Sequence, residues 1–164
     1  MAEIYSPIGR VVRTFNSNFP VLLAEEKIIY PSKELIIQLN KSMVAISNDP
    51  FVLQNEANLE HIVEAIKFKF ENRNFYEKMI LKASYLLEML AYKAHAFAEG
   101  NKRTALSVTI AFLEANNVLF QEENQEELSS FILNVASGKL NAKKISKWLQ
   151  KRTQNERLYG VEIK

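Results

Sequence analysis

The sequence predicts an all-α fold, because two patterns typical of helices recur along most of the chain. Apolar side chains return at helical spacing in segment after segment, and residues that can cap a helix often precede these segments. At 164 residues, of which 48% are hydrophobic, the chain can bury one sizeable core but is short for two domains. We therefore expect a single compact helical domain.

The first expected helix follows Ser32, which is a candidate N-cap. It carries an apolar face made of Leu35, Ile36, Leu39, Met43 and Ile46. The helix should end at residues 47–50, because Pro50 excludes helical geometry from the residue before it. Residues 1–30 form an N-terminal extension that is hard to interpret, in which residues 27–30 are expected to form a short strand.

Two further helices are expected before residue 95. The first turns Leu59, Ile62, Val63 and Ile66 inward, and His61 falls off this face, which predicts a surface histidine. Asn74, with Glu77 three residues later, forms a capping box for the next helix. That helix is expected to run for about twenty residues, or roughly 30 Å, and to deliver His95 at its end.

The remainder of the chain predicts three more helices. A nearly all-round apolar helix follows residue 104 and ends near residues 116–117. Asn124 and Glu127 form a capping box for a helix with Leu128, Phe131, Ile132 and Val135 inward, which residues 137–138 close. Asn141 caps a last helix with Ile145, Trp148 and Leu149 on one face. We therefore divide the chain into an extension (1–30), a helical domain (31–150) and a charged, frayed tail (151–164).

Composition excludes several classes of protein. The 21 basic residues are scattered and offset by 19 acidic ones, so the net charge of +2 does not favour direct nucleic-acid binding. The absence of cysteine excludes a disulfide scaffold and thiolate metal sites. The longest uncharged apolar stretch, residues 104–113, is half the length needed to cross a bilayer. We expect a soluble, cytoplasmic protein with no membrane partner.

The segment from residue 95 to residue 103 concentrates the chemically useful side chains. Gly100 permits a tight turn and leaves space for a phosphate to approach the amides at the start of the next helix. Asn101 would cap that helix or donate its amide to phosphate oxygens, while Lys102 and Arg103 would add positive charge. This pattern indicates a polyphosphate cradle.

Three other residues of the segment complete the prediction. Glu99 lies where a magnesium ion that bridges phosphates would need a carboxylate ligand. His95 is the one nearby group that can take a proton near neutral pH. Phe97 is expected to bury its ring and hold the loop against the core. Phosphoryl or nucleotidyl transfer to a hydroxyl fits best, because the chain lacks a P-loop, a cysteine nucleophile and a second histidine placed for zinc.

This segment resembles the signature of the Fic/Doc superfamily, His-x-Phe-x-(Asp/Glu)-(Gly/Ala)-Asn-x-Arg. It is most similar to the Doc (death-on-curing) toxin branch, because Lys102 stands where Fic enzymes have glycine. The resemblance extends more loosely over roughly residues 30 to 150 and implies a compact helical domain with a short flap or hairpin before the central helices. By position, Phe51, Val52 and Leu53 resemble the flap that pairs with the main chain of the target protein. An ordinary connection between helices is the alternative for this stretch.

The resemblance also implies a role for each residue of the motif. His95 would be the general base for a Ser, Thr or Tyr hydroxyl of a target protein, and Glu99 would bind the Mg²⁺ of an ATP substrate. Gly100, Asn101 and the amides near Lys102 would form the anion hole. Lys102 and Arg103 would neutralise the phosphates in the transition state.

Departures from the Fic pattern favour one reaction over another. AMP-transferring Fic enzymes usually have glycine in place of Lys102 and a second arginine where this chain has Leu106. In the Doc branch these departures accompany transfer of the γ-phosphate, to a threonine of a translation elongation factor in the best-known member. We therefore expect a Doc-like kinase, with AMP transfer and a non-catalytic nucleotide- or phosphate-binding module as alternatives.

The resemblance further implies an antitoxin protein supplied in trans. Self-inhibiting Fic proteins carry a Ser/Thr-x-x-x-Glu-(Gly/Asn) helix, and the nearest match here fails, because Met89 follows Ser84 and Glu88. Inhibition would therefore come from another chain.

Overall fold

The computed structural model describes residues 3–5, 11–14, 27–121 and 124–155. Within these residues lie six α-helices: α1 (Lys33–Ile46), α2 (Glu56–Ala65), α3 (Phe75–Glu88), α4 (Asn101–Ala115), α5 (Gln125–Ala136) and α6 (Ala142–Lys151). A 3₁₀ turn, η1 (Ile66–Phe68), extends α2, and a π-helical turn, η2 (Met89–Lys93), extends α3. The prediction of an all-α fold is confirmed.

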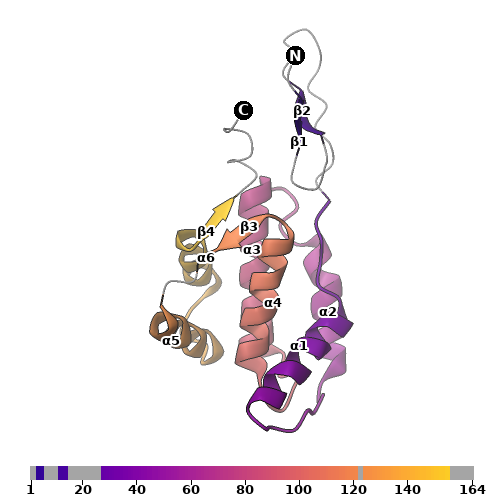
Figure 1. Ribbon diagram of the computed structural model, residues 1–164, viewed down its shortest axis with the longest axis vertical. Helices are drawn as coiled ribbons and strands as arrows, with labels where there is room; N and C mark the ends of the chain where they lie inside the picture. Colours follow the sequence, from indigo (N-terminus) through magenta and orange to yellow (C-terminus); the bar gives the residue numbers. More distant parts are fainter. Residues whose placement is uncertain (1–2, 6–10, 15–26, 122–123, 156–164) are drawn as a thin grey trace.

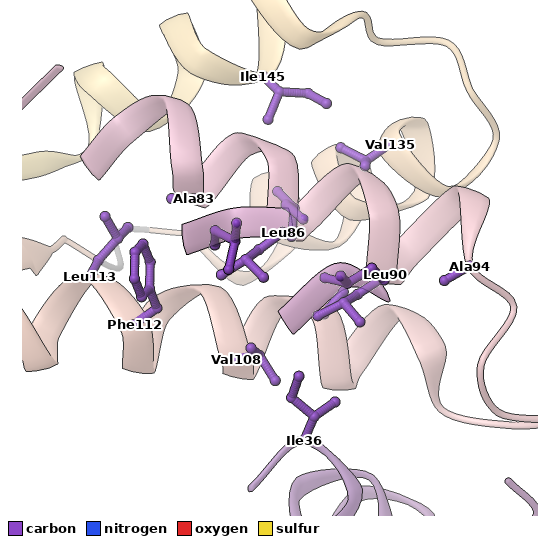
Figure 2. Close-up of a cluster of buried hydrophobic side chains, with 14 of the residues drawn as sticks. Ile36, Ala83, Leu86, Leu90, Ala94, Val108, Phe112, Leu113, Val135 and Ile145 are labelled. Atoms are coloured by element: carbon purple, nitrogen blue, oxygen red, sulfur yellow. The ribbon is translucent and has the colours of Figure 1, made fainter. Parts of the chain in front are cut away.

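Helices α3 and α4 form the centre of the domain, with α1 and α2 on one side and α5 and α6 on the other (Figure 1). Figure 2 shows Leu86 of α3 and Val108 of α4 in the layer between the central helices, with Ile36 of α1 and Ile145 of α6 packed from either side. The nearly all-round apolar character of α4 follows from this position, because neighbours cover it on several faces.

Local caps begin the helices where the sequence predicts them. The side chains of Ser32, Asn74, Asn124 and Asn141 each accept a hydrogen bond from a main-chain N–H in the first turn of α1, α3, α5 and α6. These bonds are local in sequence, which explains why sequence patterns locate the helix starts.

Short strands supplement the helices. Two expectations are wrong, one about the C-terminal tail and one about a strand at residues 27–30. Strand β3 (Val118–Phe120) pairs antiparallel with β4 (Thr153–Asn155), so the part of the tail up to residue 155 is ordered rather than frayed. Residues 27–30 form no strand, because the Asn116 carboxamide takes both main-chain bonds of Ile29, at 2.8 and 2.9 Å. In the N-terminal extension, β1 (Glu3–Tyr5) pairs antiparallel with β2 (Val11–Thr14).

None of the helices in the described ranges combines the length and the apolar character needed to cross a membrane.

The fully buried Lys82 side chain of α3 joins three neighbouring elements. Its Nζ donates to the Ile66 carbonyl at 2.7 Å, to the Tyr30 hydroxyl at 2.9 Å and to Glu71 Oε1 at 2.8 Å. A buried ammonium group needs such acceptors, because burial without them is costly. The hydrogen bond from Lys82 holds the pKa of the Glu71 carboxyl below its usual range.

Replacing Glu71 by Gln should therefore change how stability depends on acid pH. Because the pKa is lowered in the folded state, the stabilisation is present near neutral pH and is lost as the pH falls through the native value, below 4.5. The carboxylate is half exposed, so we expect Glu71→Gln to cost roughly 1 kcal/mol at pH 7, with the difference shrinking toward pH 3. Urea unfolding of both proteins across this range measures the effect, and an equal difference at every pH would contradict it.

Candidate active site

The backbone leaves its helix abruptly just before His95. The N–H of Ala94 donates to the Met89 carbonyl at 2.7 Å, which closes the π turn η2, and His95 then adopts a left-handed φ of 46°. That conformation is unfavourable for a residue with a side chain, so neighbouring groups must hold it. Asn58 Nδ2 donates to the Ala94 carbonyl at 2.8 Å, and Gln54 Nε2 donates to the His95 carbonyl at 3.2 Å. The exposed imidazole is thus presented by a restrained turn.

Phe97 anchors the loop that follows. Its ring is 1% exposed and lies against Phe51, with the ring centroids 6.1 Å apart. Its main chain forms an antiparallel bridge with Leu53, flanked by hydrogen bonds from Gln54 N–H to the Ala96 carbonyl and from Ala98 N–H to the Val52 carbonyl, at 2.9 and 3.0 Å. The expected flap therefore lies directly against the motif, and Phe97 buries its ring.

The register of this bridge leaves the other edge of the flap without a main-chain partner among the residues that the structure describes. Because the two flanking bonds lie on either side of the Leu53–Phe97 pair, the N–H and C=O groups of Leu53 point away from the motif loop. The side chains of Phe51 and Val52 beside it are exposed. An added strand could therefore bond to this edge.

Asn101 bonds to the opposite edge of Phe97. Its Oδ1 accepts from the Phe97 N–H at 3.2 Å, and its Nδ2 donates to the Phe97 carbonyl at 2.6 Å. The expectation that Asn101 caps the following helix is wrong, because the carboxamide is committed to the loop. Gly100 is the N-cap residue of α4, and it provides no side-chain cap.

The main-chain N–H groups in the first turn of α4 therefore receive no acceptor from a capping side chain. The first bond within the helix runs from Thr104 N–H to the Gly100 carbonyl at 2.9 Å, so the amides of residues 101–103 have no acceptor inside the helix. These N–H groups and the positive end of the helix dipole favour an anion. This is the geometry expected of an anion hole.

Gly100 permits the tight turn that the sequence predicts, and it also lets α1 approach the loop closely. Its φ is 79°, and a Cβ there would lie 3.0 Å from both Asn40 Nδ2 and Val44 Cγ1 of α1. The expectation that a phosphate uses the space beside Gly100 is therefore wrong on this side, because α1 fills it.

Asn40 is a site-building residue that the sequence analysis missed. It is 0% exposed, and its Nδ2 donates to the Glu99 carbonyl at 2.9 Å and to Thr104 Oγ1 at 3.1 Å. The available signal was an asparagine on the buried stripe of α1, between Ile36 and Val44. A polar residue in such a place needs buried partners, and the Asn40 Nδ2 finds them at Glu99 in the motif and at Thr104 directly after it.

Arg103 is held by the end of α1. Its guanidinium donates to the Met43 carbonyl at 2.9 Å and to Ser47 Oγ at 3.1 Å, and it lies 3.6 Å from Asp49 Oδ2. The Arg103 guanidinium, which was expected to bind phosphate, therefore already bonds to Met43 and Ser47.

Three side chains of the motif remain uncommitted: those of His95, Glu99 and Lys102. All three are exposed, and no hydrogen bond or ion pair joins them to other described residues. Glu99 suits Mg²⁺, which prefers oxygen ligands and takes few of them from the protein. The described part of the chain contains no cluster of three or more His, Asp or Glu side chains that could hold a metal.

A cavity of about 440 Å³ lies elsewhere, between α3 and α6, and contains no motif residue. Leu81, Tyr85 and Ala142 are among its lining residues, and burial raises the pKa of Tyr85. The chemistry of the motif, rather than the depth of a cavity, therefore locates the candidate active site.

A family model described as "Fic/DOC family" matches residues 30–113, which include the flap, the motif and most of α4. The chain belongs to the Fic/DOC family. Fic/DOC proteins are typically transferases that modify hydroxyl groups of other proteins, and membership supports that general class of activity here. No curated protein matches the chain.

The close approach of α1 to the Fic/DOC motif predicts that a side chain at Gly100 lowers the stability of the protein. Gly100→Ala should lower the free energy of unfolding by roughly 2 kcal/mol, because an alanine is strained at this φ and would press on Asn40 and Val44. Lys102→Ala, at an exposed position in the same turn, should change it by less than about 0.5 kcal/mol. Urea unfolding measures both values, and a Gly100→Ala protein as stable as the parent would show that α1 does not confine the loop.

Proposed function

We propose that the chain is a Doc-like toxin that transfers the γ-phosphate of ATP to a Ser or Thr hydroxyl of a target protein. One observation carries the proposal: the uncapped start of α4 lies in the same short segment as an exposed imidazole, an exposed carboxylate and an exposed ammonium group. These are a base, a metal ligand and a phosphate-neutralising group, which phosphoryl transfer needs.

In the proposed reaction, His95 accepts the proton of the target hydroxyl. The hydroxyl oxygen attacks the γ-phosphorus, the bond from that phosphorus to the β,γ-bridging oxygen breaks, and ADP leaves with the bonding electron pair. The restrained turn at residues 94–95 supports this role, because a general base must be held within reach of the proton that it takes.

The start of α4 would bind the phosphates. The amides of residues 101–103 would donate to phosphate oxygens, and Lys102 would neutralise charge as it develops in the transition state. Glu99 would hold Mg²⁺, which neutralises and orients the phosphates when it is bound. The fit of Glu99 rests on its exposed carboxylate, and the bond from Asn40 fixes its main chain.

Phosphate transfer is favoured over AMP transfer by two positions. Lys102 adds bulk and charge where AMP-transferring Fic enzymes have glycine. Leu106 occupies the position of their second arginine, and it packs partly buried against the core, so no cation is available there to clamp a γ-phosphate. Both features support a nucleotide that presents its γ-phosphate to the acceptor.

The open edge of the flap would dock the target. An extended segment of the target could bond to the free N–H and C=O groups of Leu53, with its side chains beside Phe51 and Val52. A cytoplasmic translation elongation factor is the target that the Doc resemblance favours. An antitoxin protein would then act in trans, since Glu88 pairs with Lys93 at 3.2 Å and is not aimed at the motif arginine.

Transfer of label from ATP to the proteins of a cell extract tests this function. With Mg²⁺ present, label at the γ-phosphate should appear on a protein, label at the α-phosphate should not, and His95→Ala should abolish the signal. His61→Ala removes the other exposed histidine and should leave the signal unchanged. Transfer of α-label would establish AMP transfer instead, and a protein that binds ATP without any His95-dependent product would be a binding module.

A further inference from the structure

Lys102 and Arg103 are adjacent cations in very different surroundings. Successive residues of an α-helix point about 100° apart around its axis, so the two side chains do not share one face of α4. Arg103 faces α1, where its donors are used, whereas Lys102 is exposed and has no partner among the residues that the structure describes. Their roles at a phosphate site should therefore differ.

The contacts of Arg103 close the C-terminal end of α1. The N–H of Ser47, the C-cap residue, bonds to the Ala45 carbonyl rather than to Met43, and Arg103 Nη1 supplies the donor to the Met43 carbonyl. Carbonyls at a helix end need such donors, and a cation there is favoured by the helix dipole. If the Arg103 side chain turned to bind a phosphate, the Met43 carbonyl would lose this donor.

A second layer of bonds holds the guanidinium in place. Ser47 Oγ accepts from Arg103 and donates to Asp49 Oδ2 at 2.6 Å, and the same carboxylate lies 3.6 Å from Arg103 Nη2. The positive charge of Arg103 is thus balanced by Asp49. No such carboxylate balances Lys102 within the described residues.

We propose that Lys102 is the side-chain cation that meets the phosphates, and that Arg103 is a positioning residue that fastens the start of α4 to the end of α1. This inference rests on the proposed function and refines it, because it separates two residues that the motif alone treats as equivalent. An ammonium group on a flexible stem would follow a phosphate as it moves, whereas the fixed guanidinium would keep the amides of residues 101–103 aligned.

A matched pair of substitutions tests the assignment. Lys102→Gln and Arg103→Gln each remove one positive charge, at neighbouring positions, so the change in net charge is the same in the two proteins. For each full-length protein, calorimetry would measure the affinity for ATP, ADP and adenosine in the presence of Mg²⁺, and for inorganic tripolyphosphate. Thermal unfolding would be followed in parallel, with Lys144→Gln as a distant exposed control.

We expect Lys102→Gln to weaken ATP binding at least about tenfold, ADP binding less and adenosine binding not at all, with unchanged thermal stability. Arg103→Gln should lower the unfolding temperature by several degrees and weaken ATP binding by less than about threefold. The transfer rate lost in Arg103→Gln should largely return in Arg103→Lys, which keeps a donor for the Met43 carbonyl.

The inference would be overturned if Arg103→Gln weakened the binding of ATP and tripolyphosphate as much as Lys102→Gln or more. The proposed function fails separately if the parent protein binds ATP but yields no His95-dependent product, in which case the ranking of the two cations still stands. A parent protein that binds neither ATP nor tripolyphosphate would contradict both.

Discussion

The pairing of the Asn101 carboxamide with the main chain of Phe97 is the interaction on which the candidate site depends. It gives Phe97 hydrogen bonds on one edge, while the bridge to Leu53 lies on the other, so the loop is held like the middle strand of a small sheet. The same pairing keeps Asn101 from capping α4. The donors at the start of that helix therefore stay available for an anion.

Helix α1 provides the second constraint on the loop. Asn40 bonds the Glu99 carbonyl, Arg103 bonds the Met43 carbonyl, and the absence of a side chain at Gly100 lets α1 approach closely. The side chains of Asn101 and Arg103 thus help to hold the shape of the motif. The side chains of His95, Glu99 and Lys102 are not used in this way, and they carry the chemistry of the proposed reaction. Rigid support around a few free groups is what precise transfer requires.

Sequence reasoning predicted the features that depend on local interactions. Caps such as Asn74 and Asn141 bond within their own first turn, and apolar spacing located the helices. The expected face of α1 was partly wrong, because Leu35 and Ile46 are exposed, whereas Asn40 and Val44 are buried. The order of residues in the motif also identified the family. Partners distant in the sequence were not predictable: β3 pairs with β4, and Arg103 reaches back to Met43 in α1. For the same reason Asn40 was missed, and Asn101 was interpreted as a helix cap or a phosphate donor rather than as the partner of Phe97.

The most direct test of the central claim is to observe the main-chain amides of residues 101–103 while a nucleotide binds. In ¹⁵N-resolved NMR spectra recorded during a titration with ATP and Mg²⁺, these amides should show the largest shifts in the chain and slower exchange with solvent, since phosphate oxygens would accept their hydrogen bonds. If ATP binds while these three amides do not change, the uncapped start of α4 is not the anion hole.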